Sequence, residues 1–287
     1  MLASRAAQPT TLARTLATNG CDEDRVWDEV ETRLHLKRAL RPNVLAIMRY
    51  GFTEMLNNAI EHSQAGRCAI RVTLGQSLVS FEIRDHGIGV FHSIASKLKL
   101  SDEEAALIEL IKGRTTTMPE AHTGEGIFFT SRIGDDFTLK SHRIQIEWKR
   151  VKQDMFVSQP RLSVGTFVQF SIQRSARQTM EEVFGEFAPE HYDFQFQKTR
   201  VLVKLLQPDY VSRSEARRLL ANLEKFREIV LDFRDVRSVG QGFADEVFRV
   251  FASRNPEIVL HSENASPAVM AMIRHVRRGA SADSQKT

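Results

Sequence analysis

A helical pattern followed by two alternating segments is the feature that most constrains the fold of this chain. Residues 43–63 carry apolar side chains at helical spacing, directly after a break at Arg41-Pro42. Residues 68–74 and 78–85 then alternate between apolar and polar side chains around a short turn, which predicts an antiparallel hairpin. Because the helix and the sheet must each bury an apolar face, we expect a helix layer packed on a sheet.

Further patterns extend this domain. A first helix is expected at residues 22–40, and strands are expected at residues 136–142, 144–151 and 165–173. The sequence therefore predicts a two-layer α/β sandwich with a mixed, mainly antiparallel sheet over residues 23–174. Residues 1–20 contain arginines, small residues and no acidic residue, so residues 1–22 are expected to be a disordered N-terminus.

The rest of the chain reads as a second, smaller domain. Residues 175–190 are polar and are interpreted as a linker, and residues 281–287 as a tail. Residues 191–280 alternate between strand and helix patterns, which predicts a small β/α domain. Within it, Ser212 and Glu215 form a capping-box signal, and Ser266 precedes Pro267 at the start of the last helix.

Composition excludes several classes of protein. The 287 residues include only two cysteines, Cys21 and Cys68, which is too few for a disulfide-built scaffold and indicates a cytoplasmic protein. No apolar run approaches the roughly 18 residues of a membrane span, so no membrane partner is expected. The net charge of +4 comes from scattered basic residues, and no basic stripe indicates a nucleic-acid partner.

Two polar residues stand on the predicted helix 43–63. Glu54 and Asn58 are one turn apart and therefore share a face. A carboxylate can take a proton from water or a hydroxyl, and an amide oxygen is a ligand suited to Mg²⁺. This spacing is also common on helices without any function, so on its own it indicates little.

Glycine-rich turns supply further candidate residues. Asp85-x-Gly87-x-Gly89 directly follows a predicted strand, where the carboxylate could accept a hydrogen bond from an exocyclic amine and the glycines allow close approach of a ligand. Thr123-Gly124-Glu125-Gly126 precedes a short helix, whose free N–H groups could bind phosphate. Glu125 would repel phosphate unless it points away. Gly165-Thr166 opens a late strand and could place a hydroxyl beside a base.

In this order and spacing, the four motifs resemble the GHKL ATPase superfamily, the Bergerat-fold group that includes gyrase B, heat-shock chaperones, mismatch-repair proteins and histidine kinases. The resemblance covers about residues 23–174 and implies that the chain binds ATP and Mg²⁺. It implies that Glu54 is the general base and that Asn58 binds Mg²⁺. It also implies that Asp85 binds the adenine amine, that Gly87 and Gly89 line the pocket, and that Thr166 bridges Asp85 and the base.

The same resemblance makes residues 90–123 an ATP lid, which closes on phosphates bound at Thr123, Gly124 and Gly126. A helix inside this segment is expected from the capping signal of Ser101 and Glu104. Lys112 and Arg114 could meet the γ-phosphate, although charges in such segments are usually solvated. His62 follows Asn58 as it does in anti-sigma-factor kinases, but a histidine near a helix end is an equally good interpretation.

Residues 228–251 resemble the STAS fold of anti-anti-sigma factors, and more closely a STAS-like domain of unknown function that occurs fused to GHKL modules. In the anti-anti-sigma factors a serine at the start of the following helix is phosphorylated. Here Gly240, Gln241 and Gly242 stand at that turn without a hydroxyl, and Ser238 comes earlier. The turn is either a docking site or a glycine-rich turn needed for packing.

The leading hypothesis is a regulatory protein that binds Mg-ATP, hydrolyses it slowly and passes its nucleotide state to the STAS-like domain and a protein partner. The alternatives are a Ser/Thr protein kinase of the anti-sigma-factor type, which acts on a STAS partner, and a non-catalytic interaction module controlled by ATP. Whether the chain forms a homodimer stays open.

Overall fold

The computed structural model describes residues 8–113, 125–192, 195–205 and 209–283, and the chain divides into two compact units, residues 1–184 and 185–287. The division falls inside α7 (Met180–Phe187), within the segment interpreted as a linker. None of the helices in the described ranges combines the length and apolar character needed to cross a membrane.

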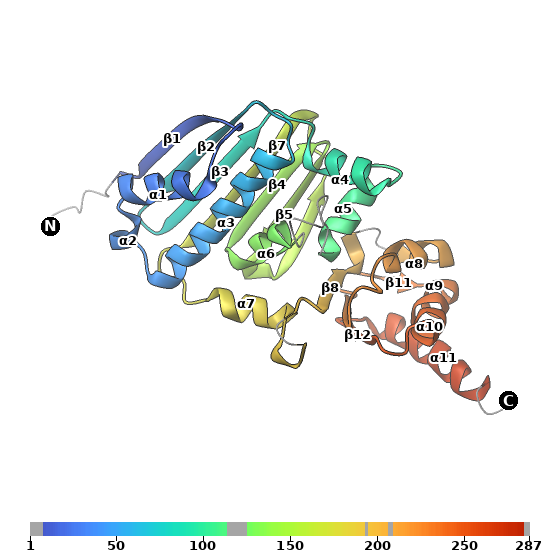
Figure 1. The fold of residues 1–287 in the computed structure, drawn as a ribbon. Coiled ribbons are helices and arrows are strands. Elements are labelled where there is room, and N and C mark those ends of the chain that lie inside the picture. The colour runs from blue at the N-terminus through green and yellow to red at the C-terminus, as the bar shows by residue number, and fades with distance from the viewer. Residues whose placement is uncertain (1–7, 114–124, 193–194, 206–208, 284–287) are drawn as a thin grey trace. The chain divides into compact units, whose positions relative to one another are not determined.

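The first unit is built on one antiparallel sheet, which in the described residues has seven strands in the order β1-β2-β3-β7-β4-β5-β6 (Figure 1). The strands are β1 (Thr10–Ala17), β2 (Arg67–Leu74), β3 (Leu78–Asp85), β4 (Asp136–His142), β5 (Ile144–Lys149), β6 (Asp154–Ser158) and β7 (Ser163–Gln173). The expected hairpin is β2–β3, in which Cys68 lies opposite Asp85. The last strand of this unit in the sequence, β7, lies in the middle of the sheet, between β3 and β4.

The helices of the first unit are α1 (Glu23–Arg33), α2 (Leu36–Ala39), α3 (Pro42–Glu61), α4 (Val90–Leu98), α5 (Glu103–Lys112) and α6 (Gly126–Ile133). Figure 1 shows α1, α3 and α6 over the same face of the sheet. Aromatic rings join the two layers: Phe52 of α3 packs edge-on against Phe81 of β3, which stacks on Phe170 of β7 at 5.0 Å between ring centroids. This arrangement confirms the predicted two-layer sandwich, although the described sheet is antiparallel throughout and not mixed as expected.

The structure of the N-terminal segment differs from the sequence prediction. Residues 1–22 were expected to be disordered, but β1 pairs with β2 along its whole length and buries Leu12 and Leu16. An edge strand takes its stability from backbone pairing on one side, and its other residues stay exposed, so its composition resembles that of a disordered segment. The second strand without a clear sequence signal, β6, lies at the opposite edge of the sheet.

The segment 90–123 contains two helices in its described part. The expected helix is α5, but its N-cap is Asp102, whose side chain accepts a hydrogen bond from the amide of Ala105 at 2.7 Å, and not Ser101. The additional helix is α4. Apolar residues of α5 are buried, among them Leu107, Leu110 and Ile111, so this helix contributes to the core of the unit.

The second unit is a small β/α domain, as predicted. Its parallel sheet has the order β12-β10-β8, formed by β8 (Lys198–Leu202), β10 (Glu228–Asp232) and β12 (Val259–Glu263), and β9 (Asp209–Tyr210) pairs separately with β11 (Ser238–Val239). The helices are α8 (Arg213–Leu220), α9 (Gln241–Asp245), α10 (Ala252–Arg254) and α11 (Pro267–Asp283), with a π-helical turn, Glu246–Phe251, between α9 and α10.

Two helix caps in this unit agree with the sequence signals. Ser212 accepts a hydrogen bond from the amide of Glu215, and the Glu215 carboxylate accepts one from the amide of Ser212 at 2.7 Å. The second bond is the main cause that lowers the pKa of Glu215. At the start of α11, Ser266 Oγ accepts a hydrogen bond from the amide of Val269.

Candidate functional site

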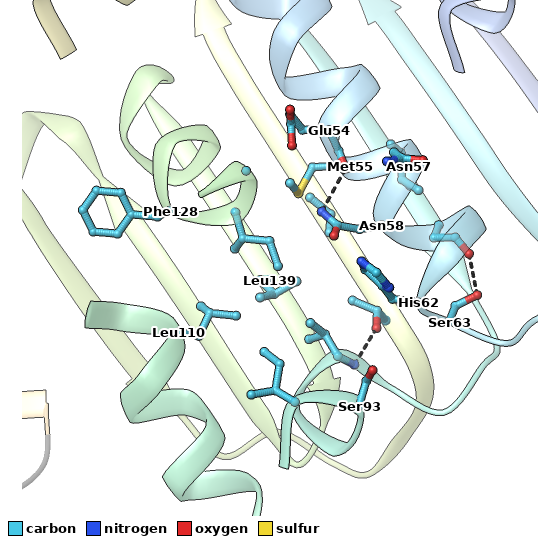
Figure 2. Close-up of a pocket in the computed structure, with 18 of the residues that line it drawn as sticks. Glu54, Met55, Asn57, Asn58, His62, Ser63, Ser93, Leu110, Phe128 and Leu139 are labelled. Carbon is cyan, nitrogen blue, oxygen red and sulfur yellow. Dashed lines mark hydrogen bonds between the residues drawn. The ribbon is translucent and has the colours of Figure 1, made fainter. Parts of the chain in front are cut away.

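A cavity of about 370 Å³ opens in the first unit, between the helix layer and the sheet (Figure 2). Its volume is within the range of small-molecule sites. Of the residues singled out in the sequence, Glu54, Asn58, Asp85, Gly126 and Thr166 line it. Residues far apart in the sequence therefore meet in one place. Thr123 and Gly124 lie outside the described residues.

Helix α3 contributes Glu54 and Asn58, one turn apart on the face turned to the cavity (Figure 2). The Asn58 side-chain NH₂ donates a hydrogen bond to the backbone carbonyl of Glu54 at 2.9 Å. This bond uses the amide nitrogen within the helix, so the Asn58 oxygen Oδ1 is the atom that can serve a ligand or a cation.

Glu54 also lies against the start of α6. A Cβ atom built on Gly126 would come within 2.0 Å of the Glu54 oxygen Oε2, so only glycine allows the carboxylate this close to the first residue of the helix. A helix start carries partial positive charge and favours an anion. The side chain expected to act as a base thus stands beside the backbone expected to bind phosphate.

This end of the cavity is acidic. Glu125, the residue before α6, lines the cavity as well. Burial and the nearby charges of Glu54 and Glu125 raise the pKa of the Tyr50 hydroxyl, another group of the lining. A phosphate entering between two carboxylates would be repelled unless a cation accompanies it, so this end fits a metal complex of a phosphate better than the free anion.

Asp85 is placed at the end of β3 and is only 3% exposed. Its oxygen Oδ1 accepts hydrogen bonds from the amides of Gly87 at 2.9 Å and Thr166 at 3.1 Å. Burial raises the pKa of the carboxyl, although both of these bonds lower it. Because both bonds fall on Oδ1, the second oxygen, Oδ2, is the one that an N–H group of a ligand could use.

The glycines that follow Asp85 pack against neighbouring elements, whereas the sequence predicted that they would contact a ligand. Gly87 and Gly89 were expected to line the cavity, but they are not among its lining residues. Gly87 instead packs against the backbone carbonyl of Ser63, where a Cβ would come within 1.9 Å. These glycines hold the turn against neighbouring elements, and the cavity wall is formed by the side chains around it.

Gly165 is the glycine whose conformation matters most for Asp85. Its φ angle is +72°, and a Cβ there would come within 2.3 Å of the backbone oxygen of Asp85. The glycine lets β7 pass directly beside Asp85, which brings the Thr166 amide to the carboxylate. Thr166 Oγ1 also accepts a hydrogen bond from the amide of Val90 at 3.1 Å. Thr166 therefore joins β3, β7 and α4, and its hydroxyl proton can still be donated.

The predicted role of Lys112 does not fit the structure. Its side chain is fully buried, with Nζ 2.8 Å from Glu109 Oε1, and it is not part of the cavity wall. Arg114 lies outside the described residues. A buried ammonium needs a partner charge, which Glu109 supplies within the same helix. In this structure Lys112 therefore pairs within α5 and is not among the residues that line the cavity.

Other lining residues carried no sequence signal. Tyr50 precedes Glu54 by one turn, and Ser93 lies on α4. Leu110, Phe128 and Leu139 supply an apolar wall (Figure 2). His62 lines the cavity and is also the C-cap residue of α3, so both interpretations of this histidine fit its position. Only the tertiary fold brings these side chains together.

The donor set fits a weakly held, hard cation. In the described residues, no group of three His, Cys, Asp or Glu side chains gathers in a way that could hold a metal ion. An Mg²⁺ ion usually keeps several waters and binds through one or two protein oxygens together with substrate phosphates. At this site it would be held by Asn58 Oδ1 and by the phosphates of the ligand.

Comparison with known families agrees with this geometry. Residues 5–147 match the family model described as histidine kinase-like ATPase domain, and residues 215–270 match the STAS-like domain of unknown function (DUF4325). A search of curated proteins found no match. The first match includes β1, Glu54, Asn58 and Asp85 but ends before β7, so the placement of Thr166 rests on the structure.

Proposed function

The first unit of this chain contains a histidine kinase-like ATPase domain and the second a STAS-like domain, and from this premise we propose a regulatory protein that binds Mg-ATP, hydrolyses it slowly and transmits its nucleotide state to the second domain. The observation that carries the proposal is the single cavity in which Glu54, Asn58, Asp85 and Thr166 meet beside the start of α6.

Binding of the base is assigned to the end of the cavity formed by β3 and β7. The Asp85 oxygen Oδ2 accepts a hydrogen bond from the exocyclic amine of adenine. The other oxygen, Oδ1, stays fixed by its hydrogen bonds from the amides of Gly87 and Thr166. A buried carboxylate rejects a carbonyl oxygen at the same position, because two acceptors would face each other without a proton. The proposed preference for adenine over guanine follows from this.

Binding of the phosphates is assigned to the opposite, acidic end. Backbone N–H groups at the start of α6 face the phosphates, and Asn58 Oδ1 holds the accompanying Mg²⁺. The ion, when bound, offsets the negative charge that Glu54 and Glu125 present to the phosphates. Segment 90–123, including α4 and α5, is proposed to act as the lid.

Hydrolysis is assigned to Glu54. Its carboxylate stands at the start of α6, where it can take a proton from a water molecule that attacks the terminal phosphate. A slow rate is expected if lid opening or product release limits turnover. The same base acting on a protein hydroxyl would make the chain a Ser/Thr kinase of the anti-sigma-factor type.

The second unit offers a surface turn for transmission to a protein partner. Ser238 is exposed on β11, and Gly240 packs against Val211, whose carbonyl a Cβ would approach within 2.7 Å. The glycine at position 240 thus has a packing explanation. We assign partner docking to this turn, and not phosphorylation, because Gly240, Gln241 and Gly242 carry no hydroxyl.

The test follows the fate of γ-labelled ATP with Mg²⁺, using the wild-type protein and the variants Glu54→Ala and Glu61→Gln. We expect free phosphate from the wild type, and a loss of about 10²- to 10⁴-fold in rate for Glu54→Ala with ATP affinity retained. Glu61→Gln is the control, because Glu61 is an exposed carboxylate on the same helix that does not line the cavity, and its rate should stay within a few-fold of the wild type.

The other outcomes separate the alternatives. Label on a protein would favour the kinase hypothesis, and binding without phosphate release would favour a non-catalytic module. Equal loss of binding and turnover in Glu54→Ala would contradict its role as the base. No ATP binding by the wild type would overturn the proposal.

A further inference from the structure

Ser93 is a buried hydroxyl that the fold leaves without a partner at the wall of the cavity. The residue is 3% exposed, and its Oγ has no hydrogen bond to any atom of the described residues. Figure 2 shows Ser93 at the wall of the cavity, which Asp85 and Thr166 also line. A buried polar group without a partner is unfavourable, and such a group in a cavity wall points to a ligand.

Three other serines in or at the end of helices bond differently from Ser93. A serine in or at the end of a helix commonly donates to a backbone carbonyl three or four residues earlier. Ser63 donates to Ala59, Ser131 to Phe128 and Ser253 to Val250. The corresponding carbonyl for Ser93 is that of Gly89, which accepts the backbone amide of Ser93 at 2.9 Å but not its hydroxyl. The hydroxyl of Ser93 is thus not satisfied by its own helix.

The position of Ser93 on α4 links it to the Asp85 end of the cavity. Val90 begins α4 and donates its amide to Thr166 Oγ1, and the Thr166 amide bonds to Asp85. Ser93 follows Val90 by three residues and therefore lies on the same face of the helix. In Figure 2 it lies at the end of the labelled side chains away from Glu54.

We propose that Ser93 determines specificity for the base. Its hydroxyl donates a hydrogen bond to the ring nitrogen of adenine that lies beside the exocyclic amine, and this amine donates to Asp85. This inference rests on the proposed nucleotide-binding function. A carboxylate and a hydroxyl donor together match an amine next to a ring-nitrogen acceptor. Guanine presents a carbonyl and a ring N–H instead, which leaves both protein groups without a suitable partner.

The experiment compares Ser93→Ala with a matched control, Thr130→Val. Thr130 is also fully buried with an unpartnered Oγ1 among the described residues, but it does not line the cavity. Calorimetry would give the affinities of the full-length variants for ATP and for its 1-deaza, 3-deaza and 7-deaza analogues, in each of which one ring nitrogen is replaced by carbon.

We expect Ser93→Ala to bind ATP roughly tenfold more weakly, as for the loss of one hydrogen bond, and Thr130→Val to bind it within about twofold of the wild type. The 1-deaza analogue, which lacks the ring nitrogen beside the amine, should bind the wild type with a similar loss, and Ser93→Ala should weaken its binding no further. Such non-additivity would identify the ring nitrogen that the hydroxyl contacts.

Stability measurements without nucleotide exclude a folding defect. Both variants remove an unsatisfied buried hydroxyl, so their melting temperatures should equal or exceed that of the wild type. If Ser93→Ala does not fold, Ser93→Cys provides the same comparison with a weaker donor of similar shape.

The outcomes distinguish failure of this inference from failure of the proposed nucleotide-binding function on which it rests. Failure of the wild type to bind ATP would overturn the proposed function, and this inference with it. The role of Ser93 alone would be overturned if Ser93→Ala bound ATP with wild-type affinity. It would also be overturned if the variant lost affinity for ATP and for all three analogues by the same factor relative to the wild type.

Discussion

At the scale of single residues, Asp85 shows how the fold maintains an unfavourable group at the candidate site. Burial raises the pKa of its carboxyl, and amide bonds from Gly87 and Thr166 offset only part of that effect. A carboxyl whose pKa is higher in the folded than in the unfolded state lowers stability wherever it is ionised. Such a group is typical of a functional site, where stability is reduced in favour of binding.

We predict that Asp85→Asn stabilises the nucleotide-free protein at neutral pH and abolishes ATP binding. The amide oxygen keeps the bonds to Gly87 and Thr166, whereas the charge and the second acceptor are lost. Because the folded pKa is raised above 3.8, the wild-type penalty is complete above the folded pKa and disappears below the unfolded one. The stability gain should therefore shrink as pH falls towards 3.8 and below.

Urea unfolding at several pH values, with ATP binding measured in parallel, checks this prediction. A gain in stability that does not depend on pH would contradict the electrostatic cause. Retained ATP affinity would contradict the role of Asp85 in binding adenine.

Glu54, Asn58 and Asp85 were expected to belong to one site, and all three line the cavity. Helical spacing places Glu54 and Asn58 on one face, but it was the family resemblance that brought Asp85 together with them. Gly87 and Gly89 are not among the residues that line the cavity, because glycine motifs indicate a close approach of two groups but do not say which groups approach. Tyr50 and Ser93 were not predicted, since only the packing of α3 and α4 on the sheet turns them to the cavity.

At the scale of secondary-structure elements, regular alternation of apolar and polar side chains predicted strands reliably, whereas the edge strands of the sheet were not predicted. Strands β2, β3 and β4 alternate regularly and were predicted nearly to the residue. The edge strands β1 and β6 have few buried side chains, and their backbone pairing leaves no pattern in the sequence. Helix α4 was obscured because the segment around it was interpreted as polar.

The capping box of α8 gives a prediction confined to the second unit. Ser212→Ala removes the side-chain acceptor for the Glu215 amide and should destabilise this unit by about 1 kcal/mol. Ser214→Ala is the control, because Ser214 contacts the cap only through the Ser212 hydroxyl at 2.9 Å, and it should change stability by less than about 0.5 kcal/mol.

Hydrogen exchange resolved by peptide reports this change. Slow amides of β8 and β10 should exchange faster in Ser212→Ala, while those of β2, β3 and β7 keep their wild-type rates. An equal increase in both units would show that they unfold as one cooperative body.

At the scale of the whole molecule, the proposal requires the two units to respond to one ligand. ATP at about 100 times its dissociation constant stabilises the state that binds it by roughly 2.7 kcal/mol. We predict slower exchange in α3, α4 and α6, which surround the cavity. If the nucleotide state is transmitted, exchange in α8 and α9 of the second unit changes as well.

Exchange with and without ATP should be measured on Glu54→Ala, which is expected to bind ATP without hydrolysing it. Wild-type protein with ADP serves as the comparison for the product state. Protection limited to the first unit would eliminate transmission and retain binding, whereas an unchanged first unit would contradict binding in the cavity.

The central place of β7 also bears on how the molecule is made. The ribosome releases β3 and β4 well before β7, which is the strand that must lie between them. Until residues 163–173 leave the exit tunnel, the nascent chain holds two unjoined halves of the sheet with open edges, and Asp85 lacks the Thr166 amide. Such long-range pairing is slow and exposes apolar surface. We therefore expect the candidate site to be completed late in translation, and the open sheet edges to be most accessible to chaperones in the interval before it.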